Sequence, residues 1–146
     1  MTLLADVAER VRTSVPALAD RVEFVADMAA LVSEGALPQK ELMAYVVPLG
    51  FDDHGGETVA GLHTQMLKQS IGVILCAKAL GDARARRALP TIDTVKDQVI
   101  AAVAGWAPVE VAGVFIVTKG RLVSVTKGLV IYQLDFAVTD QLRITR

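Results

Sequence analysis

Apolar residues recur every three or four positions near the start of the chain, and charged residues fill the opposite side of the same pattern. The apolar positions are Leu4, Val7, Ala8, Val11 and Val15. Thr2 can accept a hydrogen bond from the first helical turn, and Pro16 disfavours a helical conformation in the residue before it. The pattern predicts an amphipathic helix from about residue 3 to residue 14.

Shorter apolar runs follow this helix. Residues 21–25 alternate like a short strand, residues 27–32 fit one or two helical turns that stop at Gly35, and residues 42–49 predict a second strand. Pro48 cannot donate a backbone hydrogen bond, so we expect it at a sheet edge or a bulge.

A polar, glycine-bearing stretch at residues 51–61 separates two strand-like runs. Such a composition is typical of connections and predicts a long, mobile loop. Residues 65–78 then predict a long strand, whose apolar second half suits the centre of a sheet. Its first half carries Gln65, Lys68 and Gln69, and we expect it to project beyond the core toward water or a partner.

A second helical region opens at Gly81. Its first turns are crowded by arginines at 84, 86 and 87, and Pro90 should kink or restart it. Apolar residues then recur at helical spacing up to Gly105, and they are Ile92, Val95, Val99, Ala102, Val103 and Trp106. We expect a helix with one buried face and Trp106 as a large core residue.

The last forty residues favour strands. These are predicted at 111–118, 121–126 and 129–139, with turns at Lys119-Gly120 and Lys127-Gly128. The order of elements predicts a single α+β domain over residues 1–146, a mainly antiparallel sheet flanked by helices on one face.

Composition narrows the class of function. The chain has 146 residues, a formal net charge of −1 and 53% hydrophobic residues, of which few are aromatic. With a net charge near zero, the chain lacks the excess of positive charge with which nucleic-acid-binding proteins attract phosphates. We therefore expect no direct sequence-specific contact with nucleic acid. The hydrophobic surplus in so small a domain indicates burial between subunits.

Cys76, the only cysteine, lies in an apolar run at residues 71–77 and predicts a buried thiol. That run is far too short to span a bilayer, and the first residues do not resemble a signal peptide. We therefore expect synthesis in a cytoplasm and no membrane partner.

Candidate chemistry is sparse. Asp52, Asp53, His54 and His63 could ligate a metal, but their spacing matches no strong site pattern, and a solvated loop is the simpler interpretation. The serines lack a nucleophile-elbow context, and neither Lys-Gly pair resembles a phosphate loop. We predict no catalytic residue, metal or cofactor. A small enzyme or ligand-binding domain that uses the Asp-His group is the least favoured alternative.

Taken in order, weak signatures span nearly the whole chain: the first helix, residues 35–38 (GALP), 44–50 (AYVVPLG), 69–77, 105–108 (GWAP), 120–123 (GRLV) and 132–136 (YQLDF). In this order and spacing the chain resembles the tail terminator or tail-completion proteins of long-tailed bacteriophages, including prophage-encoded versions. The resemblance implies a non-enzymatic virion protein at the head-proximal end of the tail, made in the host cytoplasm. It also implies a ring, typically of six subunits, that caps the tail tube, ends its polymerisation and offers a surface for joining the head.

The resemblance implies no catalytic motif, and only regions can be carried over. These regions are the predicted loop at 51–61 and the projecting segment at 65–69, which are candidates for contact with neighbours. The arginine cluster at 84, 86 and 87 is most simply a solvated helix face, and contact with phosphate, an acidic partner or a neighbouring subunit is the alternative. The predicted contact residues are Phe51, Asp52, Asp53, His54, Gln65, Lys68, Gln69, Arg84, Arg86 and Arg87. Implied partners are further copies of the chain, a tail-tube protein and head–tail connector or neck proteins. Another neck, connector or tail-completion adaptor protein of a phage is the alternative function.

Overall fold

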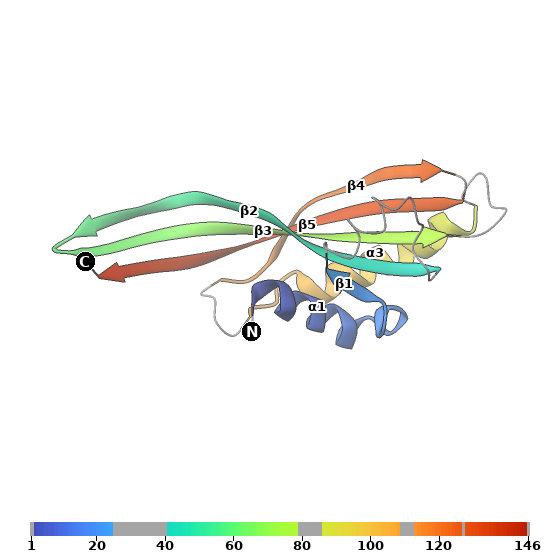
Figure 1. The fold of residues 1–146 in the computed structure, drawn as a ribbon, viewed down its shortest axis with the longest axis horizontal. Helices are drawn as coiled ribbons and strands as arrows, with labels where there is room; N and C mark the ends of the chain where they lie inside the picture. The colour runs from blue at the N-terminus through green and yellow to red at the C-terminus, as the bar shows by residue number, and fades with distance from the viewer. Residues whose placement is uncertain (1, 25–40, 79–85, 109–112, 127, 146) are drawn as a thin grey trace.

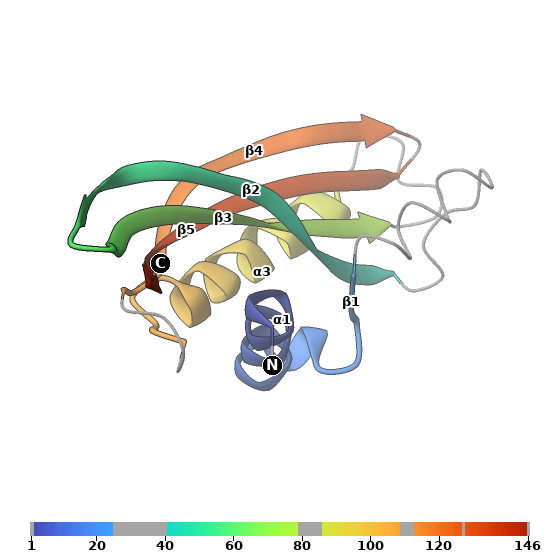
Figure 2. The ribbon, with the colours of Figure 1, turned by 60° about the vertical axis from the view of Figure 1, so that its left-hand side comes forward.

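The computed structural model describes residues 2–24, 41–78, 86–108, 113–126 and 128–145. They form one five-stranded sheet in the order β1-β2-β3-β5-β4, with the helices packed on one of its faces (Figures 1 and 2). The elements are α1 (Leu3–Ser14), a 3-10 turn (Pro16–Leu18), β1 (Val22–Phe24), β2 (Leu42–Val59), β3 (Leu62–Lys78), α3 (Ala88–Val103), β4 (Ile116–Thr126) and β5 (Leu129–Thr145). Only the β1–β2 pair is parallel among them. The predicted α+β fold is confirmed.

The first helix has the bounds that the pattern predicts. The Thr2 Oγ1 accepts a hydrogen bond from the Ala5 backbone N–H at 3.2 Å, which satisfies one of the free donors of the first turn. The side chains of Val7 and Val11 are fully buried in the core between the helices and the sheet. α1 therefore forms for the expected reason, an apolar stripe closed by a cap.

α3 begins later than predicted. It starts at Ala88, and Pro90 lies in its first turn, where the missing N–H has no partner inside the helix to lose. Pro90 therefore begins the helix and does not kink it. The helix ends at Val103, and Gly105 follows with a left-handed φ of 81°. Trp106 is half-buried and stacks on the fully buried Phe115, with ring centroids 5.8 Å apart.

The main core lies between the helices and one face of the sheet. Alternate residues of β3, Ile71, Val73 and Leu75, face Val99 and the other apolar residues of α1 and α3. Cys76 points to the opposite face, where it belongs to a smaller cluster with Met43 and Tyr45. Burial raises the pKa of the Cys76 thiol to about 11, so it stays protonated and inert at neutral pH.

The predicted loop at residues 51–61 is wrong. β2 continues through it to Val59, which lies opposite Leu62 on β3, and a two-residue turn at Ala60 and Gly61 joins the strands. Both turn residues have positive φ, 50° and 80°, as tight hairpins require. The stretch resembled a loop because neither of its faces is buried, so it lacks the apolar alternation of a strand against a core.

Two irregularities interrupt the pairing of β2 with β3. One lies between Pro48 and Gly50, at the proline expected at an edge or a bulge, although β2 continues beyond it, and the other lies between Asp53 and Gly56. β3 itself begins at Leu62, three residues before the predicted start.

The C-terminal strands also differ from the prediction. Lys119 and Gly120 do not form a turn, because β4 runs through them with a register shift at Val117/Lys119. A side chain at Gly120 would meet the Tyr132 hydroxyl at 3.1 Å, so a close contact explains this glycine. β5 extends to Thr145, beyond the predicted end at 139. The predicted turn before β5 is present at Gly128, whereas the helical turns at 27–32 lie outside the described residues.

Three strands continue past the helices as a long ribbon. We call residues 50–70 and 139–145 the arm and the remainder the body (Figure 1). In the arm, β3 is central and pairs with β2 on one side and β5 on the other. No helix of the described ranges is long and apolar enough to cross a membrane.

Candidate functional site

The arm carries seven of the ten predicted contact residues: Phe51, Asp52, Asp53, His54, Gln65, Lys68 and Gln69. Phe51 is 67% exposed, although a phenylalanine is normally buried. The projecting half of β3 was therefore correctly predicted. The role of these residues in contacts stays a prediction.

The strand register divides the arm into two faces. Phe51 lies opposite Gln69, and Asp53 lies opposite Leu67, on the face that continues the helix-covered side of the body. Asp52 lies opposite Lys68 on the other face. The seven residues therefore belong to two surfaces of one ribbon.

A series of hydrogen bonds crosses the tip of the arm, on the face that continues the helix-covered side of the body. The Thr58 hydroxyl lies 2.6 Å from Nδ1 of His63, and Nε2 of His63 lies 3.1 Å from the side-chain carbonyl oxygen of Gln65. Because that oxygen only accepts, Nε2 of His63 must donate. Nε2 of Gln65 in turn donates to Asp53 Oδ1 at 2.9 Å. This series ties β2 to β3 where no core does so.

Asp53 is the acceptor at the end of this series. The hydrogen bond from Gln65 and that from the Gly55 backbone N–H hold the pKa of the Asp53 carboxyl below its usual range. The carboxylate is therefore ionised in any ordinary buffer. It is fully exposed, so its effect on global stability is small.

The arrangement does not gather the Asp-His group into a ligand set. Asp53 and His63 line the same hollow of about 210 Å³, joined through Gln65, whereas Asp52 faces the other side of the ribbon. In the part of the chain that the structure describes, no three His, Cys, Asp or Glu side chains come together as a metal site needs.

Arg86 and Arg87 lie at the far end of the body from the arm. Both are exposed beside the start of α3, and Arg84 lies outside the described residues. The ten predicted contact residues therefore do not form one continuous surface. That the arginines touch a neighbour stays a prediction.

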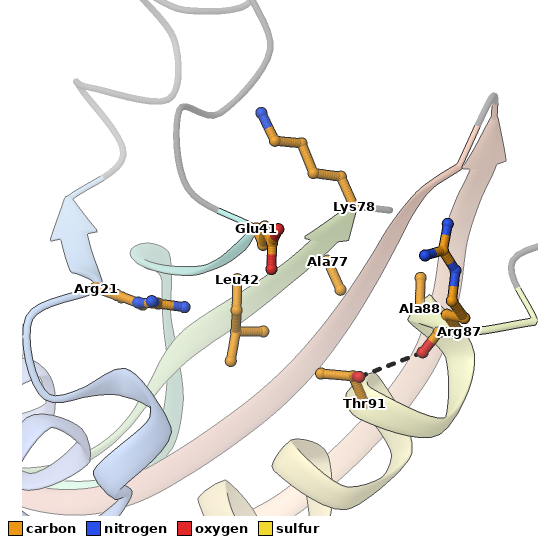
Figure 3. A pocket seen from close by; sticks show the side chains of 8 residues that line it. All are labelled: Arg21, Glu41, Leu42, Ala77, Lys78, Arg87, Ala88 and Thr91. Carbon is orange, nitrogen blue, oxygen red and sulfur yellow. Dashed lines mark hydrogen bonds between the residues drawn. The ribbon is translucent and has the colours of Figure 1, made fainter. Parts of the chain in front are cut away.

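Arg87 lines a cleft of about 450 Å³ between the start of α3, the start of β2 and the end of β3 (Figure 3). Arg21 and Lys78 add positive charge and Glu41 adds negative charge, while Leu42 and Ala77 form apolar wall. In Figure 3 the three cationic groups are spread around the cleft and do not converge on one point. The cleft therefore has positive character without the geometry of a site for a small anion.

The outer strand β4 is a surface that the sequence pattern missed. It exposes a row of apolar side chains together with Lys119 and Arg121, and the apolar ones are Ile116, Val117, Leu122, Val123 and Val125. β4 pairs with β5 on one side, and no described strand covers its other side. The sequence did offer one signal for this surface, because residues 116–126 contain basic residues and no acidic ones. The predicted turn at Lys119-Gly120 divided these residues between two strands, so the signal was missed.

The family model described as Phage tail terminator protein matches residues 2–146. No curated protein matches the sequence. Among solved structures, a chain of "Virion of native gene transfer agent (GTA) particle" has a similar fold, with a TM-score of 0.55 and 18% sequence identity over 96% of this chain and 95% of that chain. At this identity the likeness shows a shared fold.

Proposed function

Because the chain belongs to the phage tail terminator family, we propose that it forms a six-membered ring that caps the tail tube of a long-tailed phage or prophage. The family makes it a structural, non-enzymatic component of a virion tail. In the proposal the ring sits at the head-proximal end of the tail, ends tube polymerisation and offers a surface to head–tail connector proteins. The match over residues 2–146 is the observation that carries it.

The proposed mechanism is steric and thermodynamic. A ring that occupies the growing face of the tube leaves the next ring of tube subunits no surface to bind. Binding energy alone performs the task, so no covalent step is required.

Exposed apolar surface supports assembly with other chains. Phe51 on the arm and Leu122 on β4 are each at least half exposed, and the exposed Val117 and Val125 lie on the same face of β4 as Leu122. Contiguous apolar surface on a small domain marks contact with a protein partner. The arm also extends well beyond the body (Figure 1), which leaves it accessible to a neighbouring subunit in the proposed ring.

The test is tube growth in the presence of the protein. Tail-tube subunits from the same genome are polymerised with and without the purified chain, and lengths and ends are scored by electron microscopy. We expect shorter tubes of fixed final length that carry the protein at one end. Tubes that keep growing while the protein stays free would contradict the proposal. Protein bound at the ends of tubes that keep growing would favour the alternative, a neck, connector or adaptor protein.

A further inference from the structure

Two strands on opposite sides of the sheet, β2 and β4, carry charges of opposite sign. β2 contains Asp52, Asp53 and Glu57 and no Lys or Arg, whereas β4 contains Lys119 and Arg121 and no Asp or Glu. These strands are separated by β3 and β5 in the sheet order. One lateral edge of the subunit is therefore acidic and the other is basic.

The opposite charges also lie on the same face of the sheet. Asp52 and Glu57 lie opposite Lys68 and Thr64, on the side of β3 that faces away from the helices. Lys119 and Arg121 lie opposite Asp135 and Gln133, which belong to the corresponding side of β5. Along the strands the acids are level with residues 64–68 of β3, and the bases are level with residues 72–74. When two copies form one continuous sheet and are shifted along the strands, so that the arm of one lies beside β4 of the other, acid and base meet on the same side of that sheet.

Both strands have an edge available for pairing. β1 covers β2 only at Ala44–Val46, so no described strand lies on the outer side of residues 47–59. β4 offers a comparable length over Ile116–Thr126. Phe51 and Val59 on β2, and Ile116 on β4, are more than half exposed, so the edges also have apolar surface to bury.

We propose that the acidic outer edge of the β2 arm pairs with the basic β4 edge of a second copy of this chain. The inference rests on the proposed ring and names its contact. Pairing of like edges is opposed, because β4 against β4 would place cations together and β2 against β2 would place carboxylates together. Contact between two different edges is heterologous, the kind that closes into a ring rather than a two-fold dimer.

The experiment exchanges the charges of the two edges. One variant carries Lys119→Glu and Arg121→Glu, a second carries Asp52→Lys and Glu57→Lys, and a third carries all four changes. The control carries Glu9→Lys and Asp20→Lys, side chains that are 58% and 79% exposed on the N-terminal segment, with the same charge change as the second variant. Ring mass and tube-end binding are measured by native mass spectrometry and microscopy, with circular dichroism to show that each variant folds.

The proposed contact predicts a specific pattern of loss and rescue. Each two-residue variant alone should assemble at least about tenfold more weakly than the unchanged chain, because every contact then joins like charges. An equimolar mixture of the two should recover alternating rings, and the four-residue variant should assemble by itself, as should the control.

Rings that form equally well from either two-residue variant would overturn this contact while leaving the proposed function intact. Loss without rescue in the mixture, or an equal loss in the control, would also overturn it. An unchanged chain that makes no ring and ignores tube ends would instead contradict the proposed function itself.

Discussion

The body and the arm are parts of one sheet, yet different forces hold them together. The body buries apolar side chains of both helices and alternate residues of β2, β3 and β5 in one continuous core. In the arm, every residue of 50–70 and 139–145 is exposed or half-buried. A fully buried core side chain contributes about 1.5–3 kcal/mol, whereas a cross-strand pair contributes roughly 0.2–1 kcal/mol. The body therefore has a core of its own, whereas the arm has none and would gain stability from the contact that we propose.

The side-chain hydrogen bonds of the arm are consistent with its lack of a core. A ribbon of strands without a hydrophobic face is marginal in water. The series of hydrogen bonds from Thr58 through His63 and Gln65 to Asp53 fixes its tip without removing surface that a partner could use. The arm thus keeps its shape while its outer edge stays open.

The largest effect should come from a charge placed in the body. Val99 is fully buried on the core face of α3. Val99→Asp should lower the free energy of unfolding by about 3–5 kcal/mol, because the carboxylate would be buried without a partner. Thermal melting followed by circular dichroism measures this, with Gln98→Asp on the exposed face as the control. A soluble Val99→Asp protein that melts at the original temperature would show that the body does not depend on this core.

A smaller, local effect should follow from a change at Gly56. A Cβ there would overlap the backbone carbonyl oxygen of Thr64 and approach the Cα of Gln65 within 2.6 Å, so the β2–β3 pairing of the arm must shift. Gly56→Val should leave the melting of the body nearly unchanged and speed amide exchange in residues 50–70. Glu57→Val adds the same side chain at the next, exposed position and serves as the control. If Gly56→Val lowered the melting temperature as much as a core substitution, body and arm would be one cooperative unit.

The smallest effect should be the response of the arm tip to acid. The pKa of Asp53 is lowered in the folded chain, so its contribution is complete above the ordinary value of 3.8 and is lost as the pH falls through the lower, folded value. Below pH 3.8 the Gln65 side-chain amide should therefore lose its bond and its NMR signal should shift. Asp53→Asn should remove that titration. A shift that persists in Asp53→Asn would assign it to another group.

Sequence patterns predicted the body well and the arm poorly, for the same physical reason. Periodicity reports burial against a core, and α1 and the buried face of α3 were found because they pack on one. Residues 51–59 do not pack against a core, so their polar side chains and glycines led to the prediction of a loop. In the structure β2 continues through these residues. The arm lies where contact residues were predicted, because exposed polarity does indicate a projecting surface.

The basic edge was missed for a related reason. Lys119-Gly120 looked like a turn because it contains a glycine and lies between two strand-like runs. In the structure β4 continues through it, just after a register shift at Val117/Lys119, and Gly120 lies close to the Tyr132 side chain. Opposite charge on two outer strands has meaning only once the sheet order is known. No local pattern shows that β4, and the part of β2 beyond its pairing with β1, form the two edges of the sheet.

Hydrogen exchange, compared between the dilute subunit and the tube-bound assembly, tests most directly whether the arm is completed by a partner. We expect residues 71–77 of the body to be protected in both states. Residues 50–59, and Ile116–Thr126 of β4, should exchange quickly in the dilute subunit and slowly in the assembly. An arm as protected as the body in the dilute subunit, or unprotected in the assembly, would contradict the account.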